Sequence, residues 1–110
     1  MKVLMEHEQD FRDEEAHNWD FQLSFSCSEK YDQFVNWLSY EFYFFQQDQD
    51  RLFTIYFPNG KVQVEKEEHH DRTLLSKVTI ESKCQKIGLK MKKKVSEFLH
   101  HIEKYHKLSQ

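Results

Sequence analysis

The segment from Trp19 to Cys27 alternates strictly between apolar and polar side chains, and this alternation constrains the fold more than any other feature of the sequence. Its apolar positions are Trp19, Phe21, Leu23, Phe25 and Cys27. Successive side chains of a strand point to opposite faces of a sheet. One face of this strand must therefore be covered by a core, while the other face meets water.

Four further stretches predict strands, and turns are expected between them. Three strands are expected at Arg51 to Phe57, Lys61 to Glu67 and Leu74 to Glu81. Pro58-Asn59-Gly60 supplies the tight turn after the first of them, and a charged turn spans about Glu68 to Arg72. A short apolar run in Lys2 to Glu8 predicts another strand, which the acidic stretch from Gln9 to Asn18 would join to the alternating strand as a hairpin.

The middle of the chain follows a helical period instead. Ser26 with Glu29 fits a capping box and Ser28 is a competing N-cap, so we expect a helix from near Glu29 to about Gln47. Its inward stripe is Tyr31, Phe34, Val35, Leu38, Phe42 and Phe45. A second aromatic set outside this stripe comprises Trp37, Tyr40, Tyr43 and Phe44. Such a helix must be sandwiched in the fold or cover part of a partner.

A second helix is expected from near Lys83 to Gln85 until about Lys107. Its inward residues are Ile87, Met91, Val95, Phe98, Leu99 and Ile102. Gly88 weakens its first turn by up to about 1 kcal/mol relative to alanine, so the helix could also begin after Gly88.

These elements predict one domain over residues 1–110 with the order β-β-α-β-β-β-α. Hairpins and short connections favour an antiparallel sheet. The predicted fold class is α+β, a two-layer sandwich in which two helices cover one face of a sheet of about five strands. A chain of 110 residues has room for one core of this kind.

The composition restricts the class of protein. The chain is 38% hydrophobic and 32% charged, with only two glycines and one proline, which argues against disordered and low-complexity proteins. No apolar run approaches the roughly 18 residues of a membrane span, and Met1 to Asp10 turns acidic where a signal peptide would be basic and then apolar. We expect a cytoplasmic protein in which Cys27 and Cys84 are free, buried thiols.

No motif in the sequence is typical of catalysis or of cofactor binding. The only glycines, Gly60 and Gly88, lie in a hairpin turn and a lysine-rich helix, so no phosphate-binding loop or nucleophile elbow is present. His69 and His70 are adjacent in the sequence, and on a strand they would point to opposite faces rather than share one ion. We therefore expect no enzyme activity, no cofactor and no metal site.

Charge is segregated along the chain, and this asymmetry points to a charged partner. Residues 1–50 hold twelve Asp and Glu against three Lys and Arg, a net charge of −9, whereas residues 83–110 hold eight lysines against two glutamates, a net charge of +6. Acidic surfaces accelerate association with basic partners, and Trp and Tyr are favoured interface anchors.

The leading hypothesis is a non-enzymatic inhibitor that covers a basic functional surface of another protein, such as a nuclease toxin. Immunity proteins, antitoxins and phage-encoded inhibitors act in this way. The residues expected to steer the partner are Asp10, Asp13, Glu14, Glu15 and Asp20. The residues expected to anchor it are Trp37, Tyr40 and Tyr43, unless the second aromatic set is buried as core.

An alternative hypothesis uses the opposite end of the chain. The lysine-rich start of the last helix would bind phosphates of RNA or DNA through Lys90, Lys92, Lys93 and Lys94. Self-association is a third hypothesis, so both a monomer and a homodimer remain open.

Overall fold

The computed structural model describes residues 1–10, 16–67 and 73–108. Its strands are β1 (Lys2–Asp10), β2 (His17–Phe25), β3 (Gln46–Gln49), β4 (Phe53–Phe57), β5 (Gly60–Lys66) and β6 (Leu74–Ser82). Its helices are α1 (Ser28–Glu41) and α2 (Gln85–Leu108). The predicted α+β class is confirmed, with six strands among the described residues where about five were expected.

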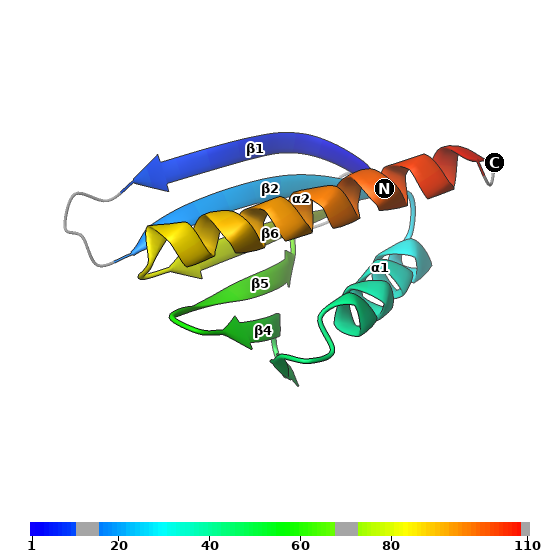
Figure 1. Ribbon diagram of the computed structural model, residues 1–110. Helices are drawn as coiled ribbons and strands as arrows, with labels where there is room; N and C mark the ends of the chain where they lie inside the picture. Colours follow the sequence, from blue (N-terminus) through cyan, green and yellow to red (C-terminus); the bar gives the residue numbers. More distant parts are fainter. Residues whose placement is uncertain (11–15, 68–72, 109–110) are drawn as a thin grey trace.

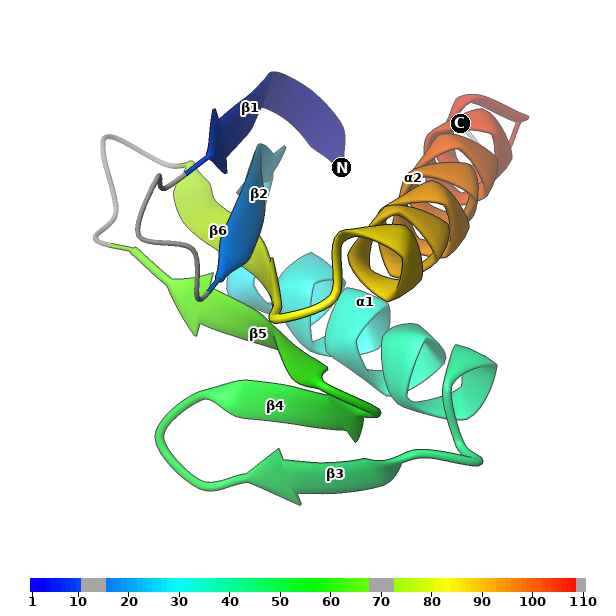
Figure 2. The same ribbon diagram turned by 60° about the vertical axis from the view of Figure 1, so that its left-hand side comes forward.

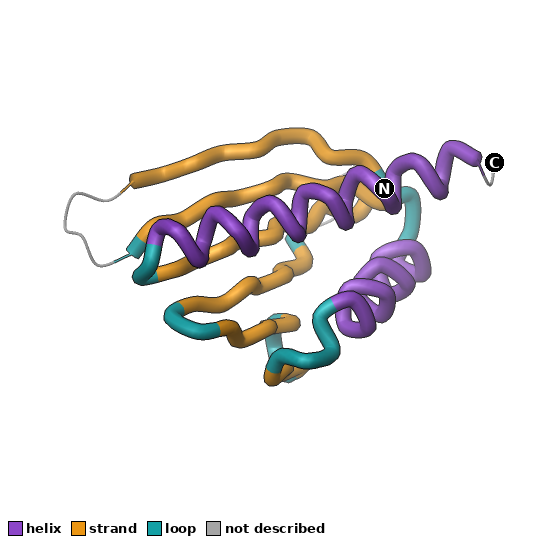
Figure 3. Tube along the Cα trace, in the orientation of Figure 1, coloured by secondary structure: helices purple, strands orange, loops and turns teal. Residues whose placement is uncertain are grey.

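All strands belong to one antiparallel sheet in the order β1-β2-β6-β5-β4-β3. The sheet curves, and both helices lie on its inner face (Figures 1 and 2). β6 lies between β2 and β5, and in its pairing with β2 Phe21 lies opposite Val78. Figure 3 shows the strands, the two helices and the described loops that connect them. The predicted two-layer arrangement is therefore present.

The alternation that opened the sequence analysis sets the two faces of the sheet. Alternate residues of β2, from Trp19 to Phe25, are buried, and the residues between them are partly exposed. β6 repeats the pattern from Leu74 to Ser82, in register with β2. The inner face therefore packs against the helices, while the outer face is polar.

The first helix begins one residue earlier than expected and without the predicted capping box. α1 starts at Ser28, and its N-cap residue is Cys27, whose backbone is extended and whose side chain makes no capping hydrogen bond. The Tyr31 N–H donates to the Cys27 carbonyl at 3.4 Å, which places the first turn too late for Ser26 to cap it. Cys27 is exposed, contrary to the prediction of a buried thiol, because β2 ends at Phe25; Cys84 is partly buried.

The end of α1 corrects the predicted boundary at Gln47. The helix stops at Glu41, and the Phe45 N–H donates to the Phe42 carbonyl at 3.0 Å in the turn that follows. The side-chain amide of Gln47 donates to the carbonyls of Ser39 at 2.9 Å and Phe42 at 2.8 Å. This amide satisfies carbonyls that a helix end leaves without partners, so the chain can turn back as β3.

The second helix begins at Gln85, so Gly88 lies inside it. Its expected inner residues are buried or partly buried. The other side of the helix is tied to β1, because Lys92 Nζ lies 2.6 Å from Glu6 Oε1 and the Val3 N–H donates to Glu103 Oε1 at 2.8 Å. Within the described ranges, neither helix combines the length and the apolar character needed to cross a membrane.

Gly88 is required by close packing, and we expect its replacement by alanine to destabilise the fold. A Cβ atom there would lie 2.5 Å from Trp19 Cζ3 and 2.8 Å from Ser82 Cβ. Overpacking costs about 1–3 kcal/mol, more than the roughly 1 kcal/mol that alanine adds through helix propensity. Urea unfolding followed by tryptophan fluorescence should therefore show a lower free energy of unfolding for Gly88→Ala.

The matched control is Lys93→Ala at an exposed position of the same helix. We expect it to change the free energy of unfolding by no more than about 0.5 kcal/mol. A Gly88→Ala variant as stable as the wild type would contradict the role of close packing at this position.

Candidate functional site

Three large aromatic side chains stand in solvent at the end of α1. Tyr40 is 69% exposed, Tyr43 66% and Phe44 84%, and we call these three residues the aromatic ridge. The rings of Tyr43 and Phe44 lie with their centroids 4.1 Å apart at an angle of 31°. Exposed aromatic side chains that gather in one place are typical of interaction surfaces.

The turn that ends α1 creates this ridge. Phe42 points inward and is 3% exposed, with its ring centroid 6.3 Å from that of Phe45. The two residues between them, Tyr43 and Phe44, are thereby directed outward. The turn leads into β3 at the edge of the sheet, away from β1 (Figure 2).

A pocket lies beside the ridge, between the end of α1 and the middle of α2. We call it the ridge pocket, and its volume is about 550 Å³. It is lined by Glu41, Phe42, Phe44, Phe45, Lys94, Glu97, Phe98 and His101. A smaller, mostly apolar pocket of about 160 Å³ shares Phe45 and Lys94 with it. Phe44 thus belongs both to the ridge and to the wall of the ridge pocket.

The stretch of chain that contains the ridge is acidic. The segment from Ser28 to Asp50 carries five exposed acids and one exposed base, Lys30, for a net charge of −4. The acids are Glu29, Asp32, Glu41, Asp48 and Asp50. These acids lie on α1, on β3 and directly after β3, whereas the exposed Lys94 of α2 lines the ridge pocket together with Phe44.

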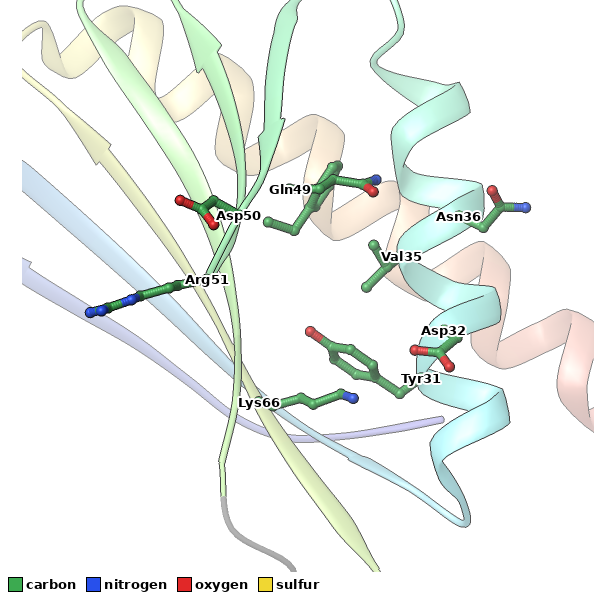
Figure 4. Close-up of a pocket in the computed structure, with 9 residues that line it drawn as sticks. Tyr31, Asp32, Val35, Asn36, Gln49, Asp50, Arg51 and Lys66 are labelled. Atoms are coloured by element: carbon green, nitrogen blue, oxygen red, sulfur yellow. The ribbon is translucent and has the colours of Figure 1, made fainter.

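A second pocket, of about 400 Å³, lies between α1 and the strands β3 to β5 (Figure 4). In it, Lys66 extends toward Tyr31 and its Nζ lies 5.0 Å from the ring centroid, whereas Arg51 points away from α1. Burial, with a smaller contribution from the Asp32 carboxylate, raises the pKa of Tyr31 to about 12. Tyr31 therefore keeps its proton at neutral pH and is unsuited to act as a general base there.

The raised pKa of Tyr31 predicts a loss of stability at alkaline pH. The folded chain holds this proton more tightly than the unfolded chain, in which the pKa is near the ordinary value of 10.0. The contribution of the protonated Tyr31 to the free energy of unfolding is therefore complete below pH 10. It decreases as the pH rises toward about 12. Urea unfolding of the wild type and Tyr31→Phe at several pH values should show the wild type losing stability relative to the variant over this range. If the free energies of unfolding of the two proteins changed in parallel with pH, the raised pKa of Tyr31 would be contradicted.

The structure places Asp20, one of the acids predicted to steer a partner, on the opposite face of the sheet from the helix that carries the predicted aromatic anchors. Asp20 lies on the outer face of the sheet, 4.0 Å from Lys77 Nζ, and the helices lie on the other face. Asp10 is the last residue of β1 and pairs with His17. The other predicted acids, Asp13, Glu14 and Glu15, lie outside the described residues.

The predicted aromatic anchors lie closer together. Tyr40 and Tyr43 both belong to the ridge, and Trp37, one turn earlier, is only partly exposed. The sequence hypothesis assigned no partner contact to Phe44, the most exposed of the large hydrophobic side chains. The sequence signal for its exposure was its position outside the inward apolar stripe of the predicted helix.

The four lysines of the nucleic-acid hypothesis do not share one face of α2. Lys92 faces β1, where it pairs with Glu6. Lys90, Lys93 and Lys94 are exposed and lie within about 100° of one another around the helix axis. Lys94 also lines the ridge pocket.

Among residues 1–10, 16–67 and 73–108, no three His, Cys, Asp or Glu side chains are grouped so that they could hold a metal ion. His69 and His70 lie outside these ranges.

Comparison with known proteins adds a resemblance of fold. No protein-family model matches the sequence, and no curated protein matches it. Among solved structures, the chain is similar to CalU16 from Micromonospora echinospora, with 13% sequence identity and a TM-score of 0.49. The similarity covers 91% of this chain and 83% of CalU16.

Proposed function

We propose that this chain is a non-enzymatic protein-binding module that acts stoichiometrically by covering a basic functional surface of another protein. The classes that work in this way are immunity proteins, antitoxins and phage-type inhibitors. The observation that carries the proposal is the aromatic ridge of Tyr40, Tyr43 and Phe44 at the end of α1.

The ridge has the properties of an interface core. Tyr is enriched among the residues that dominate binding energy, because it buries much area with few rotatable bonds. Two of the three ridge residues are tyrosines. Tyr40 lies in the last turn of α1, and Tyr43 and Phe44 lie in the hydrogen-bonded turn that follows it, so the three rings are held close to the helix end.

The charge around the ridge selects for a basic partner. The net charge of −4 between Ser28 and Asp50 would attract a basic surface and repel an acidic one. The acids of residues 1–50 as a whole add a longer-range field that accelerates the encounter. Association should therefore slow as the salt concentration rises, because ions screen this field.

Affinity capture from the native cell tests the proposal. The full chain would be immobilised beside a variant in which Tyr40, Tyr43 and Phe44 are all replaced by serine, and each lysate would be treated with nuclease. We expect one basic protein to be retained by the wild type in a one-to-one ratio and lost by the variant. Retention that survives the triple substitution, or that disappears with nuclease, would contradict the proposal.

Nucleic-acid binding is the second candidate, because Lys90, Lys93 and Lys94 form an exposed basic face on α2. This candidate predicts that the lysines, and not the aromatic ridge, are needed for retention of the partner. Replacing these lysines by glutamate should abolish retention of RNA or DNA and leave capture of a basic protein unchanged or stronger.

A further inference from the structure

We infer that the ridge pocket is the acceptor site for an arginine side chain of the partner protein. This inference rests on the proposed function and names the partner group that the site would take. The walls of the pocket are aromatic: Phe42, Phe45 and Phe98 line it, and Phe44 forms its exposed edge. A guanidinium group placed over such rings is attracted by their electron-rich faces.

Two carboxylates in the pocket favour a cation. Glu41 comes from α1 and Glu97 from α2, and among the described residues neither has an ion-pair partner. The lysine of the lining, Lys94, leaves a net charge of −1. An incoming arginine would neutralise this charge and could bind a carboxylate through two parallel hydrogen bonds.

The end of α1 adds to this negative potential. Glu41 and Phe42 line the pocket, so the C-terminal end of the helix borders it. This end carries a partial negative charge that cations stabilise, and no basic residue lies in the last turn of α1. The Gln47 amide already donates to the Ser39 and Phe42 carbonyls, so a cation would add an electrostatic attraction to the helix end rather than a missing hydrogen bond.

The aromatic lining of the pocket favours arginine over lysine. A volume of about 550 Å³ leaves room for the apolar stem of the side chain as well as its head. The planar guanidinium group stacks on aromatic rings and is less strongly hydrated than an ammonium group, so it loses less on entering an aromatic pocket.

The inference can be tested without the partner by titrating the ¹⁵N-labelled chain with N-acetyl-arginine methylamide. N-acetyl-citrulline methylamide is the matched control, because it has the same shape without the charge. We expect arginine to cause saturable shifts of the backbone amides of Phe44, Phe45 and Glu97, with Asp20 on the outer face unaffected. The citrulline probe should bind at least about threefold more weakly.

Substitution of two charged residues of the pocket lining tests whether the pocket prefers a positive charge. Glu97→Gln should weaken arginine binding about two- to fivefold, and Lys94→Ala should strengthen it by a similar factor, because one removes an attraction and the other a repulsion. The spectra themselves show whether each variant is folded. Equal binding of citrulline, or no saturable shift with arginine, would overturn the inference.

An anionic amphiphile is the competing occupant, and hexanoate is its probe. Saturable shifts of the same amides by hexanoate that Lys94→Ala abolishes would overturn the arginine assignment. Phe44 belongs both to the capture variant and to the pocket lining, so the capture is repeated with only Tyr40 and Tyr43 replaced by serine, because both lie outside that lining. Arginine binding without any captured protein would leave the pocket assigned and refute the proposed function. Ridge-dependent capture without arginine binding would refute the pocket alone.

Discussion

Phe34→Ala is expected to remove about 3–5 kcal/mol from the free energy of unfolding. Phe34 is 2% exposed, and its ring centroid lies 5.4 Å from that of Phe25 on β2 and 5.9 Å from that of Phe98 on α2. One side chain thus joins the sheet to both helices. Because small domains are stable by only about 5–15 kcal/mol, this loss should leave a substantial unfolded population at 37 °C. Urea unfolding and thermal unfolding monitored by circular dichroism would measure it.

Tyr40→Ala on the same helix is the matched control. Tyr40 projects into solvent, so its truncation should change the free energy of unfolding by no more than about 0.5 kcal/mol. A Phe34→Ala variant that unfolds at the same urea concentration as Tyr40→Ala would mean that the helices do not pack on the sheet as described.

The triple substitution of Tyr40, Tyr43 and Phe44 by serine should raise the Kd for the captured partner at least about 100-fold. Truncation of an interface anchor typically costs about 2 kcal/mol or more, and each 1.4 kcal/mol is a factor of about ten in Kd. Calorimetric titration of the wild type and the variant with the purified partner would measure the change. The loss should appear mainly as faster dissociation, because the acids that accelerate the encounter are unchanged.

Tyr56→Ser controls for the loss of an exposed aromatic ring as such. Tyr56 is 43% exposed, but it lies on the outer face of the sheet, opposite the helices. Its substitution should leave the Kd unchanged within about twofold, since it lies outside the proposed interface. If Tyr56→Ser raised the Kd as much as the triple substitution, the partner would not bind specifically through the ridge.

The parts of the fold that the sequence predicted correctly are those where one periodicity is strong. The alternation in β2 allows only one buried face, and so does the helical spacing of Met91, Val95, Leu99 and Ile102. In the structure these apolar faces are buried. Pro58, Asn59 and Gly60 fix the hairpin between β4 and β5, where Asn59 adopts the positive φ of 68° that the turn requires.

The errors arose where tertiary contacts decide the structure. β3 has no apolar side chain, so no pattern marked it as a strand, and its pairing with β4 decides its conformation. The helix boundary at Glu41 depends on the Gln47 amide, which reaches back to the Ser39 and Phe42 carbonyls. Neither contact can be read from the local sequence.

The sequence indicated that some aromatic residues would be exposed, but not where the ridge pocket would form. The excess of aromatics over the inward stripe indicated that some of them must find another environment, and Tyr40 and Tyr43 are indeed exposed. The ridge pocket joins Glu41 to Glu97 and Phe42 to Phe98, which lie 56 residues apart in the chain. Only the packing of the two helices brings these pairs together.

The pairing of β2 with β6 determines when the sheet can be completed during synthesis. Residues paired across these strands are separated by 49 positions at Phe25 and Leu74 and by 65 positions at His17 and Ser82. The edge of β2 that pairs with β6 therefore stays unpaired until more than two thirds of the chain has been made. Such long-range pairing slows folding and exposes nascent strands to aggregation. A chaperone that covers this strand edge during synthesis should consequently raise the yield of folded protein.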